Sequence, residues 1–290
     1  MSRFAASLFT ITTFALRAQA QCPDYLRTNY AVTGSPRAIA TADFNRFTVS
    51  EADDLFDLTA ADFNGDGMSD LAMLSSNANK VSIRFGQGNG TFGPANLYSI
   101  GLVSRGIVAT DFNGDGKVDL AVSSLGSNTV SVLLNNGDGT FATSPYSVNG
   151  APNTIAAADF NHDGKPDLAM GIIITASVML NNGNGTFAPD VQYATGVSPT
   201  AIATDDFDRD GNADIVTANQ SSANLSLILG IGNGTFRAPI LHAVGTTPWG
   251  IAIGDFTRRG RAGLAIANFG SNNVSVLLDR CVSPRRAARH

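Results

Sequence analysis

The chain is poor in glutamate, in helical patterns and in long apolar runs. Of its 24 acidic residues only Glu51 is a glutamate, and the rest are aspartates. Aspartate is a poor helix former that suits turns and metal-binding loops. Beyond the first twenty residues no stretch has helical periodicity, and no apolar run is long enough to cross a bilayer. These absences argue against a helical bundle and a helical membrane protein.

Residues that commonly carry catalysis are also scarce. The three histidines are His162 in an Asp-rich loop, His242 in an expected strand and His290 at the end. No acid/base pair stands out, and no nucleophile elbow, zinc motif or phosphate loop is present. The Arg285-Arg286 tail is too short to favour nucleic acid. We therefore expect a protein that is not an enzyme; an extracellular hydrolase or lyase is the alternative.

A ten-residue stretch, Asp111 to Leu120, recurs along the chain. Intact copies run over 62–71, 159–168 and 206–215, and a worn copy runs over 255–264. Their starts lie 49, 48, 47 and 49 residues apart. Self-similarity at such a period is the signature of a repeat architecture.

Each repeat contains four short strands, here called a to d. In the second repeat, strand a is Gly106 to Thr110, strand b starts at Leu120, strand c is Val130 to Leu134, and strand d lies near Tyr146. An Asn-Gly or Asp-Gly turn followed by Thr-Phe separates c from d, and such turns are strong hairpin signals. This pattern predicts an all-β fold, a β-propeller with four-stranded antiparallel blades.

The two ends of the chain complement each other. The fifth repeat has strands over 251–254, 264–266 and 274–278 but no strand d, whereas Leu26 to Val32 resembles a lone strand d. We expect five blades, the last completed by this N-terminal strand, and a rudimentary sixth around Asp43 and Asn45. The alternation of c and d then places Cys22 beside Cys281, which predicts a disulfide of about 4–5 kcal/mol in the chain-entropy model. Two unpaired thiols are the alternative.

The first twenty residues have the pattern of a secretory signal. Arg3 precedes an apolar run over 4–16, and Ala18-Gln19-Ala20 suits cleavage. A buried N-terminal helix is the alternative. We expect three regions: a signal at 1–20, a propeller at 21–281 and a basic tail at 282–290. The product would be soluble and secreted, or periplasmic or at the cell surface in a bacterium.

The repeated loop has the donor spacing of a calcium site. Oxygen-bearing side chains occupy positions 1, 3, 5 and 9, a backbone carbonyl serves position 7, and a glycine at position 6 allows a sharp turn. An Asp/Asn/Gly turn without metal is the alternative, but four copies with Asp at 1, 5 and 9 favour about four Ca²⁺ sites. The expected ligands are Asp62, Asn64, Asp66, Met68 and Asp70; Asp111, Asn113, Asp115, Lys117 and Asp119; Asp159, Asn161, Asp163, Lys165 and Asp167; and Asp206, Asp208, Asp210, Asn212 and Asp214.

The worn copy is expected to hold no metal. Asp255, Thr257, Arg259 and Gly263 occupy positions 1, 3, 5 and 9 there, and the Asp43 fragment lacks positions 5 and 9. Charge agrees with four ions. The formal charge is −5, removal of the signal's two arginines gives −7, and four Ca²⁺ would leave about +1.

These loops, with the V-S-V-L-L and N-G-D-G-T-F segments that follow the second, resemble FG-GAP/VCBS repeats. Those extracellular repeats are similar to the propeller of integrin α chains, and the resemblance covers about Tyr30 to Leu278. It implies calcium on one face and, in integrins, ligand on the opposite face. Two departures are the small number of blades, where family propellers usually have seven, and the worn last loop.

We expect a secreted adhesion or recognition module that binds a glycan or a protein. The face opposite the Asp loops carries segments 75–79, 123–128, 219–224 and 268–273, whose amides and hydroxyls suit hydrogen bonding. Merely solvated turns are an equal alternative, and a purely structural unit is a third possibility. Trp249, the only tryptophan, begins a strand near this face, where packing is favoured over a role as a sugar platform.

Overall fold

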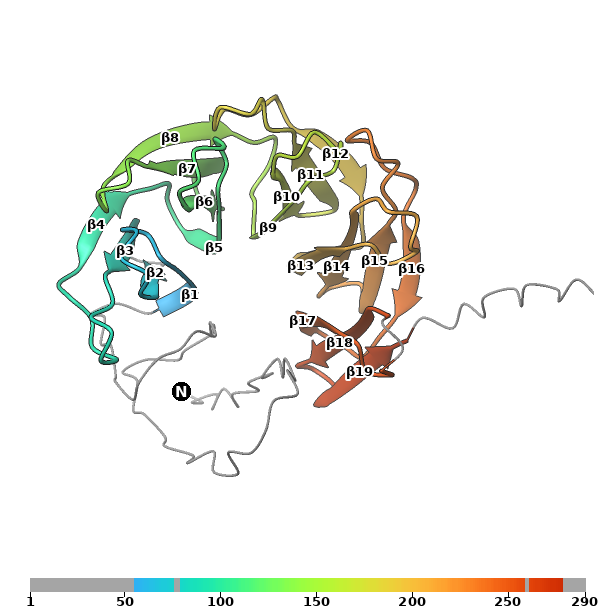
Figure 1. Cartoon of the computed structure of the whole chain (residues 1–290). Helices are drawn as coiled ribbons and strands as arrows, with labels where there is room; N and C mark the ends of the chain where they lie inside the picture. Colours follow the sequence, from blue (N-terminus) through green and yellow to red (C-terminus); the bar gives the residue numbers. More distant parts are fainter. Residues whose placement is uncertain (1–54, 76–78, 259–260, 279–290) are drawn as a thin grey trace, which may run out of the picture.

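The computed structural model describes residues 55–75, 79–258 and 261–278. They form nineteen strands in five antiparallel sheets, set around a central axis like the blades of a propeller (Figure 1). Among these residues no helix is long and apolar enough to cross a membrane. The all-β propeller expected from the sequence is confirmed.

The strands occur in the predicted order. Blade 1 contains β1 (Leu55–Ala61), β2 (Asp70–Ser75), β3 (Lys80–Arg84) and β4 (Asn96–Ser99), and blade 2 contains β5 (Ser104–Thr110), β6 (Asp119–Ser124), β7 (Thr129–Asn135) and β8 (Phe141–Ser147). Blade 3 contains β9 (Thr154–Ala158), β10 (Asp167–Ile172), β11 (Thr175–Met179) and β12 (Val191–Ala194), and blade 4 contains β13 (Pro199–Asp205), β14 (Asp214–Asn219), β15 (Asn224–Ile228) and β16 (Ile240–Ala243). Blade 5 contains β17 (Pro248–Gly254), β18 (Gly263–Asn268) and β19 (Asn273–Leu277).

Within each blade the strands pair as a–b–c–d from the axis outwards, and in the described residues blade 5 has only a, b and c. The a strands line the axis and contact their neighbours in turn, from β1 through β17 (Figure 1). Antiparallel pairing places the a–b and c–d connections at one face of the ring, and the b–c and d–a connections at the other. We call these the Asp-loop face and the opposite face.

Several sequence predictions lie outside the described residues. They are the signal at 1–20, the strand at 26–32, the Asp43 fragment, Cys22, Cys281 and the tail at 282–290. They remain predictions, as does the completion of blade 5.

The hydrophobic core lies between blades rather than inside any one of them. The b strands β6, β10 and β14 are buried along their whole length, because adjoining blades cover both faces of each sheet. Phe112 and Val132 of blade 2 share one cluster with Leu168 and Met170 of blade 3. Each blade therefore depends on its neighbours for its stability.

An aromatic cluster repeats at each of the first three blade junctions. Phe141 of blade 2 packs edge-on against Phe63 and Tyr98 of blade 1, with ring centroids 5.9 and 5.4 Å apart. The Tyr98 hydroxyl donates to the Gly139 carbonyl at 3.2 Å. The same arrangement joins blades 2 and 3 and blades 3 and 4, with Phe112, Tyr146 and Phe187, and then Phe160, Tyr193 and Phe236.

The turn that precedes Thr-Phe needs a glycine, because the preceding blade packs closely against it at this junction. Gly139 has a φ of +80°, and a Cβ built on it would lie 2.5 Å from Cζ of Phe85 in the preceding blade. Any side chain would meet both a backbone strain and a clash with an aromatic ring. The Asn/Asp-Gly signal therefore marks a contact between blades as well as a hairpin turn.

Blade 5 has less cover than the other blades within the described part of the chain. Val274 and Val276 of β19 are exposed, whereas Val130 and Val132, at the same positions of β7, are fully buried. No described strand pairs with the outer edge of β19. Phe256 is likewise 50% exposed, although Phe63, Phe112 and Phe160 at its position are buried.

We expect Phe141→Ala to destabilise the protein by about 3–5 kcal/mol, because it removes the ring shared by two blades and leaves a cavity. Phe256→Ala is the matched control and should cost less than about 1 kcal/mol, since that ring is half exposed. Urea unfolding followed by circular dichroism measures both. Equal losses for the two variants would contradict the packing described here.

Candidate metal-binding loops

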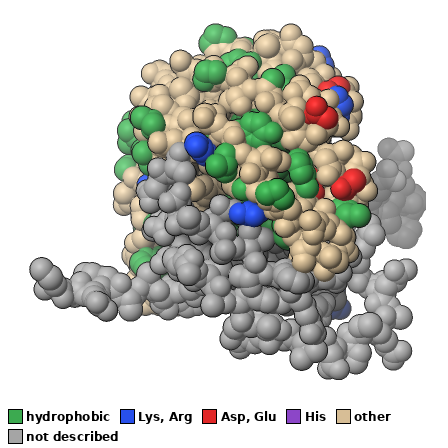
Figure 2. All heavy atoms as spheres, turned by 90° about the vertical axis from the view of Figure 1, so that its left-hand side faces the viewer, with side chains coloured by type: hydrophobic (Ala, Val, Ile, Leu, Met, Phe, Trp, Pro, Cys, Tyr) green, Lys and Arg blue, Asp and Glu red, His purple; other side chains and the backbone are tan. Residues whose placement is uncertain are grey.

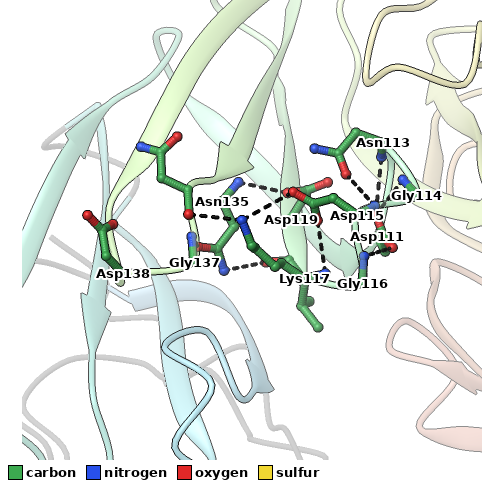
Figure 3. Close-up of polar contacts among 12 residues, drawn as sticks. Asp111, Asn113, Gly114, Asp115, Gly116, Lys117, Asp119, Asn135, Gly137 and Asp138 are labelled. Atoms are coloured by element: carbon green, nitrogen blue, oxygen red, sulfur yellow. Dashed lines mark hydrogen bonds and ion pairs between the residues drawn. The ribbon is translucent and has the colours of Figure 1, made fainter.

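Hydrogen bonds from the backbone to the Asp and Asn side chains shape the loops, and Figure 3 shows those of the loop in blade 2. Asp111 accepts the N–H groups of Gly114 and Gly116, both at 2.7 Å, on separate carboxylate oxygens. Asn113 accepts the N–H of Asp115 at 3.0 Å. These bonds turn the side chains of positions 1 and 3 inward, which is the arrangement that the alternating donor spacing predicts.

The other three loops repeat this geometry. Position 1 accepts the N–H of the position-6 glycine in each loop, from Gly67 to Asp62, Gly164 to Asp159 and Gly211 to Asp206. Position 4 has a positive φ even where it is not glycine, namely 60° at His162 and 66° at Arg209. The loop bonds therefore hold the same turn despite the cost of that conformation for a residue with a side chain.

The position-9 carboxylate has a structural role that the sequence did not reveal. Asp119 is fully buried, and its two oxygens accept the N–H of Phe112 at 2.9 Å and of Asn135 at 2.7 Å. It therefore joins the start of its own loop to the end of strand c. Asp70, Asp167 and Asp214 are buried and make the same pair of bonds.

Burial raises the pKa of all four position-9 carboxyls, to about 6 for Asp167 and Asp214. The two N–H donors oppose this shift by stabilising the charged form, and the negative charges of nearby loop aspartates add to it. The loops thus concentrate negative charge that is only partly compensated by the backbone.

Asparagine side chains connect two of these loops to the next blade, which sequence reasoning also missed. Asn135 donates to the Phe63 carbonyl in the loop of blade 1 at 2.7 Å, and also to the Val118 carbonyl in its own loop. Asn181 donates in the same way to Phe112 in the loop of blade 2 and to Pro166. The available signal was the Asn-Asn-Gly sequence at the end of strand c.

The position-7 residues lie above the c–d turn of their own blade. Lys117 donates to the Asn136 carbonyl at 2.9 Å and lies 3.5 Å from the Asp115 carboxylate. Asn212 forms a 2.7 Å hydrogen bond with His162 of the preceding loop. Met68 and Lys165 pack closely over Gly88 and Gly183. The predicted ligand at this position is the backbone carbonyl, so these side chains can support the loop.

The donor set fits a hard cation such as calcium. Oxygens of Asp206, Asp208 and Asp210 lie within 4.8 Å of one another, and the other loops place an Asn at the middle position. Carboxylate and amide oxygens with a backbone carbonyl are the ligands that Ca²⁺ prefers. The position-9 Asp is fully buried, whereas the residues at positions 1, 3 and 5 are partly or fully exposed. The two oxygens of positions 1 and 9 both accept N–H groups, and each oxygen retains a further lone pair. Positions 1, 3, 5 and 7 would therefore carry most of the coordination.

The worn fifth loop keeps Asp255 at position 1 but lacks the aspartates that the other loops have at positions 5 and 9. Thr257 donates through its N–H and its hydroxyl to Asp255, at 3.0 and 3.1 Å. Gly263 stands where the other loops have the buried Asp, and a Cβ there would lie 2.8 Å from the Phe256 ring. The aromatic ring thus lies against the space that a position-9 side chain would need.

Comparison with protein families agrees with this architecture. The FG-GAP-like repeat matches residues 62–122, 111–170 and 206–266, more than half of the chain. The chain belongs to the FG-GAP-like repeat family. No protein of curated function matches the sequence.

Solved structures with similar folds come from proteins of different function. A functionally unknown protein from Desulfotomaculum acetoxidans has a TM-score of 0.56 at 12% identity, over 80% of this chain and 71% of that one. A virginiamycin B lyase from Staphylococcus aureus has a TM-score of 0.55 at 12% identity, over 80% and 69%. A periplasmic gluconolactonase from Pseudomonas aeruginosa has a TM-score of 0.51 at 16% identity, over 66% and 55%. The FG-GAP chain spans about half of the last, and identities this low support a common fold alone.

The buried aspartates predict a pH dependence of the metal-free protein. Asp167 and Asp214 have a folded pKa of about 6, against an ordinary value of 3.8 for an aspartate in water. Their contribution to stability is therefore fully present below about pH 3.8 and is lost as the pH rises through about 6. Urea unfolding in metal-free buffer should give a lower free energy of unfolding at pH 7 than at pH 5. A free energy that rises over this interval would contradict the burial of these charges.

Proposed function

We propose that this FG-GAP protein is a calcium-stabilised recognition module that binds a glycan or a protein outside the cytoplasm. The observation that carries the proposal is the contrast between its two faces. In the described residues, every a–b connection contains aspartate, whereas no b–c or d–a connection contains a charged residue. In the side view of Figure 2 the acidic side chains gather along the right-hand edge.

From this contrast we infer that the Asp-loop face stabilises the ring and the opposite face binds the ligand. The Asp loops are bound to the strands and to neighbouring blades by the buried carboxylates and by Asn135 and Asn181, so bound calcium would stiffen the ring. The opposite face offers exposed apolar side chains, including Leu102, Ile173 and Val197. Exposed apolar groups beside amides and hydroxyls are typical of recognition surfaces.

Some of the polar side chains expected on the opposite face are buried. Ser123 and Asn219 are fully buried. The Asn219 amide donates to Asn224 and Ser226, both at 2.9 Å. Recognition would therefore depend on the tips of the connections rather than on their whole length.

Export from the cytoplasm is part of the proposal. It is supported by the signal-like pattern at 1–20 and by the two cysteines that the sequence places for a disulfide. Millimolar calcium outside cells would also suit exposed loops, whose affinity is expected to be modest.

An extracellular hydrolase or lyase is the second candidate, and one pocket favours it. A pocket of about 410 Å³ lies between blades 4 and 5 and is lined by Asp205, Asp206, Arg209, Asp255 and Arg261 among others. A carboxylate there could act as a general acid or base, and the guanidinium groups could bind an anionic part of a substrate. Turnover of a polymer substrate that is lost in Asp205→Asn would favour this candidate over recognition alone.

We expect calcium to raise the melting temperature markedly, because it binds the folded loops only. Asp111→Ala should lower the number of bound ions from about four to about three, and should reduce the calcium-dependent shift. Asp255→Ala is the matched control in the worn loop and should change neither quantity. Calorimetry and differential scanning fluorimetry with calcium or EGTA measure both. A melting temperature that EGTA does not change would refute the calcium proposal.

For recognition, we expect the intact chain to bind members of a glycan or protein array in calcium, and to bind more weakly in EGTA. Calcium acts here through the scaffold, so Asp111→Ala should weaken binding without changing which array members are bound. An array on which nothing binds in calcium would count against the recognition module.

A further inference from the structure

Two aromatic side chains form an exposed pair on the opposite face of blade 5. Trp249 begins β17 and is 41% exposed, and Phe269 follows β18 and is 51% exposed. Their ring centroids lie 6.4 Å apart with an angle of 52° between the planes. Trp249 therefore packs against a neighbouring ring, as expected, but a substantial part of the residue is exposed to solvent.

The backbone presents Trp249 through a β-bulge. The register between β17 and β18 shifts between Pro248 and Gly250, so Trp249 is the extra residue on its strand. Bulges re-aim a side chain relative to the sheet. The same shift occurs in β1, β5 and β13, where the bulged residues are Phe56, Arg105 and Thr200.

The side chains at the other bulges have partners in adjacent blades. The Arg105 guanidinium lies over the Phe56 ring at 4.4 Å from its centroid. Thr200 donates to the Pro248 carbonyl of blade 5 at 2.8 Å. Trp249 instead lies beside Phe269 of its own blade. The bulges of the other blades thus contribute contacts between blades, whereas the bulge of blade 5 presents an exposed aromatic side chain.

The turn beneath Phe269 is fixed by hydrogen bonds. The Thr247 carbonyl accepts the N–H of Phe269 at 2.9 Å, and the Thr246 carbonyl accepts the N–H of Gly270 at 3.0 Å. Thr247 has a φ of 52°, which is unusual for a β-branched residue. Ser271 accepts the N–H of Thr246 and completes the link. The two rings thus project from a backbone that is set before any ligand arrives.

The two connections of blade 5 that carry the pair are polar but uncharged. The segments 244–250 and 267–273 contain no Asp, Glu, Lys, Arg or His. Thr246 and Asn272, in these same connections, are exposed. An uncharged surface with aromatic faces, hydroxyls and amides lacks the cations that a nucleic acid or an acidic polymer requires. It matches a ligand with apolar C–H faces and many neutral hydroxyl groups.

We propose that Trp249 and Phe269 form the platform of a binding site for a neutral glycan, on which sugar rings stack while Thr246 and Asn272 hydrogen-bond to hydroxyls. This inference rests on the proposed recognition function and names its ligand class and its site. Rigid aromatic side chains at the centre of a contact surface commonly supply most of the binding energy.

The single tryptophan of the chain makes the site directly observable. Titration of the intact protein in calcium with soluble neutral oligosaccharides, built from glucose, mannose, galactose or xylose, is followed by tryptophan emission. We expect at least one series to change the emission and to protect Trp249 from acrylamide quenching. Phe269→Ala should weaken that response by about tenfold or more, as loss of an aromatic anchor does.

Phe256→Ala is the matched control, because that phenylalanine is equally exposed but belongs to the Asp-loop face. It should leave the response unchanged. Trp249→Ala is tested on the glycan array and should lose binding, and circular dichroism and the calcium-dependent melting shift show whether each variant is folded. If Trp249→Ala does not fold, the Phe269→Ala titration alone decides the outcome.

Three results would overturn the proposal. They are an emission that no neutral oligosaccharide changes, a response that Phe269→Ala leaves intact, and preferential binding of an acidic polysaccharide such as polygalacturonate. Array binding that Trp249→Ala does not alter would refute this platform while the recognition function stands. An array without any bound glycan or protein would instead refute both.

Discussion

The buried carboxylate at the end of each Asp loop is the contact on which the rest of the blade depends. Asp119 and its three equivalents, all buried, each join the second residue of the loop to a residue at or just beyond the end of strand c, through two hydrogen bonds. Charge-assisted bonds of this kind are strong, and their loss would leave two buried N–H groups without partners. Blade 5 has Gly263 at this position, and its loop lacks the common form.

The blades hold one another by repeating the same joint. An aromatic cluster, a tyrosine hydroxyl that donates to a glycine carbonyl and, at two junctions, an asparagine amide connect blades 1 to 4 in turn. The joint weakens at the fourth junction, where His242 replaces the tyrosine and no Thr-Phe turn follows in the described residues. Phe207, which would pack at that junction, is accordingly only partly buried. Phe256 and the edge of β19 lie on the other side of blade 5, where the described residues provide neither a strand d nor a following blade.

The two faces of the ring differ in charge, although the same repeat builds both of them. Aspartates concentrate where strands a and b meet, since the repeat places them there in every blade. In the described residues, the connections on the opposite face differ in sequence from blade to blade but contain no charged residue. Each blade can therefore present different side chains on a similar backbone. Blade 5, the least complete described blade, is also the one whose bulge presents a tryptophan to solvent. Under the proposed function, stability and recognition therefore belong to different connections of the same repeat.

The sequence by itself determined the propeller, the order of the four strands and the loops that are candidates for calcium. These are local properties, because the period of about 48 residues, the Asn/Asp-Gly turns and the Asp spacing each act within one repeat. Only the tertiary structure decided that the position-9 aspartate of each intact loop is buried, that Asn135 reaches the loop of the preceding blade and that Trp249 is partly exposed to solvent. Those features arise from contacts between residues up to about a repeat and a half apart in the chain, and from a bulge whose effect depends on the neighbouring blade. A single sequence carries no direct sign of such contacts, so packing alone assigned those side chains their roles.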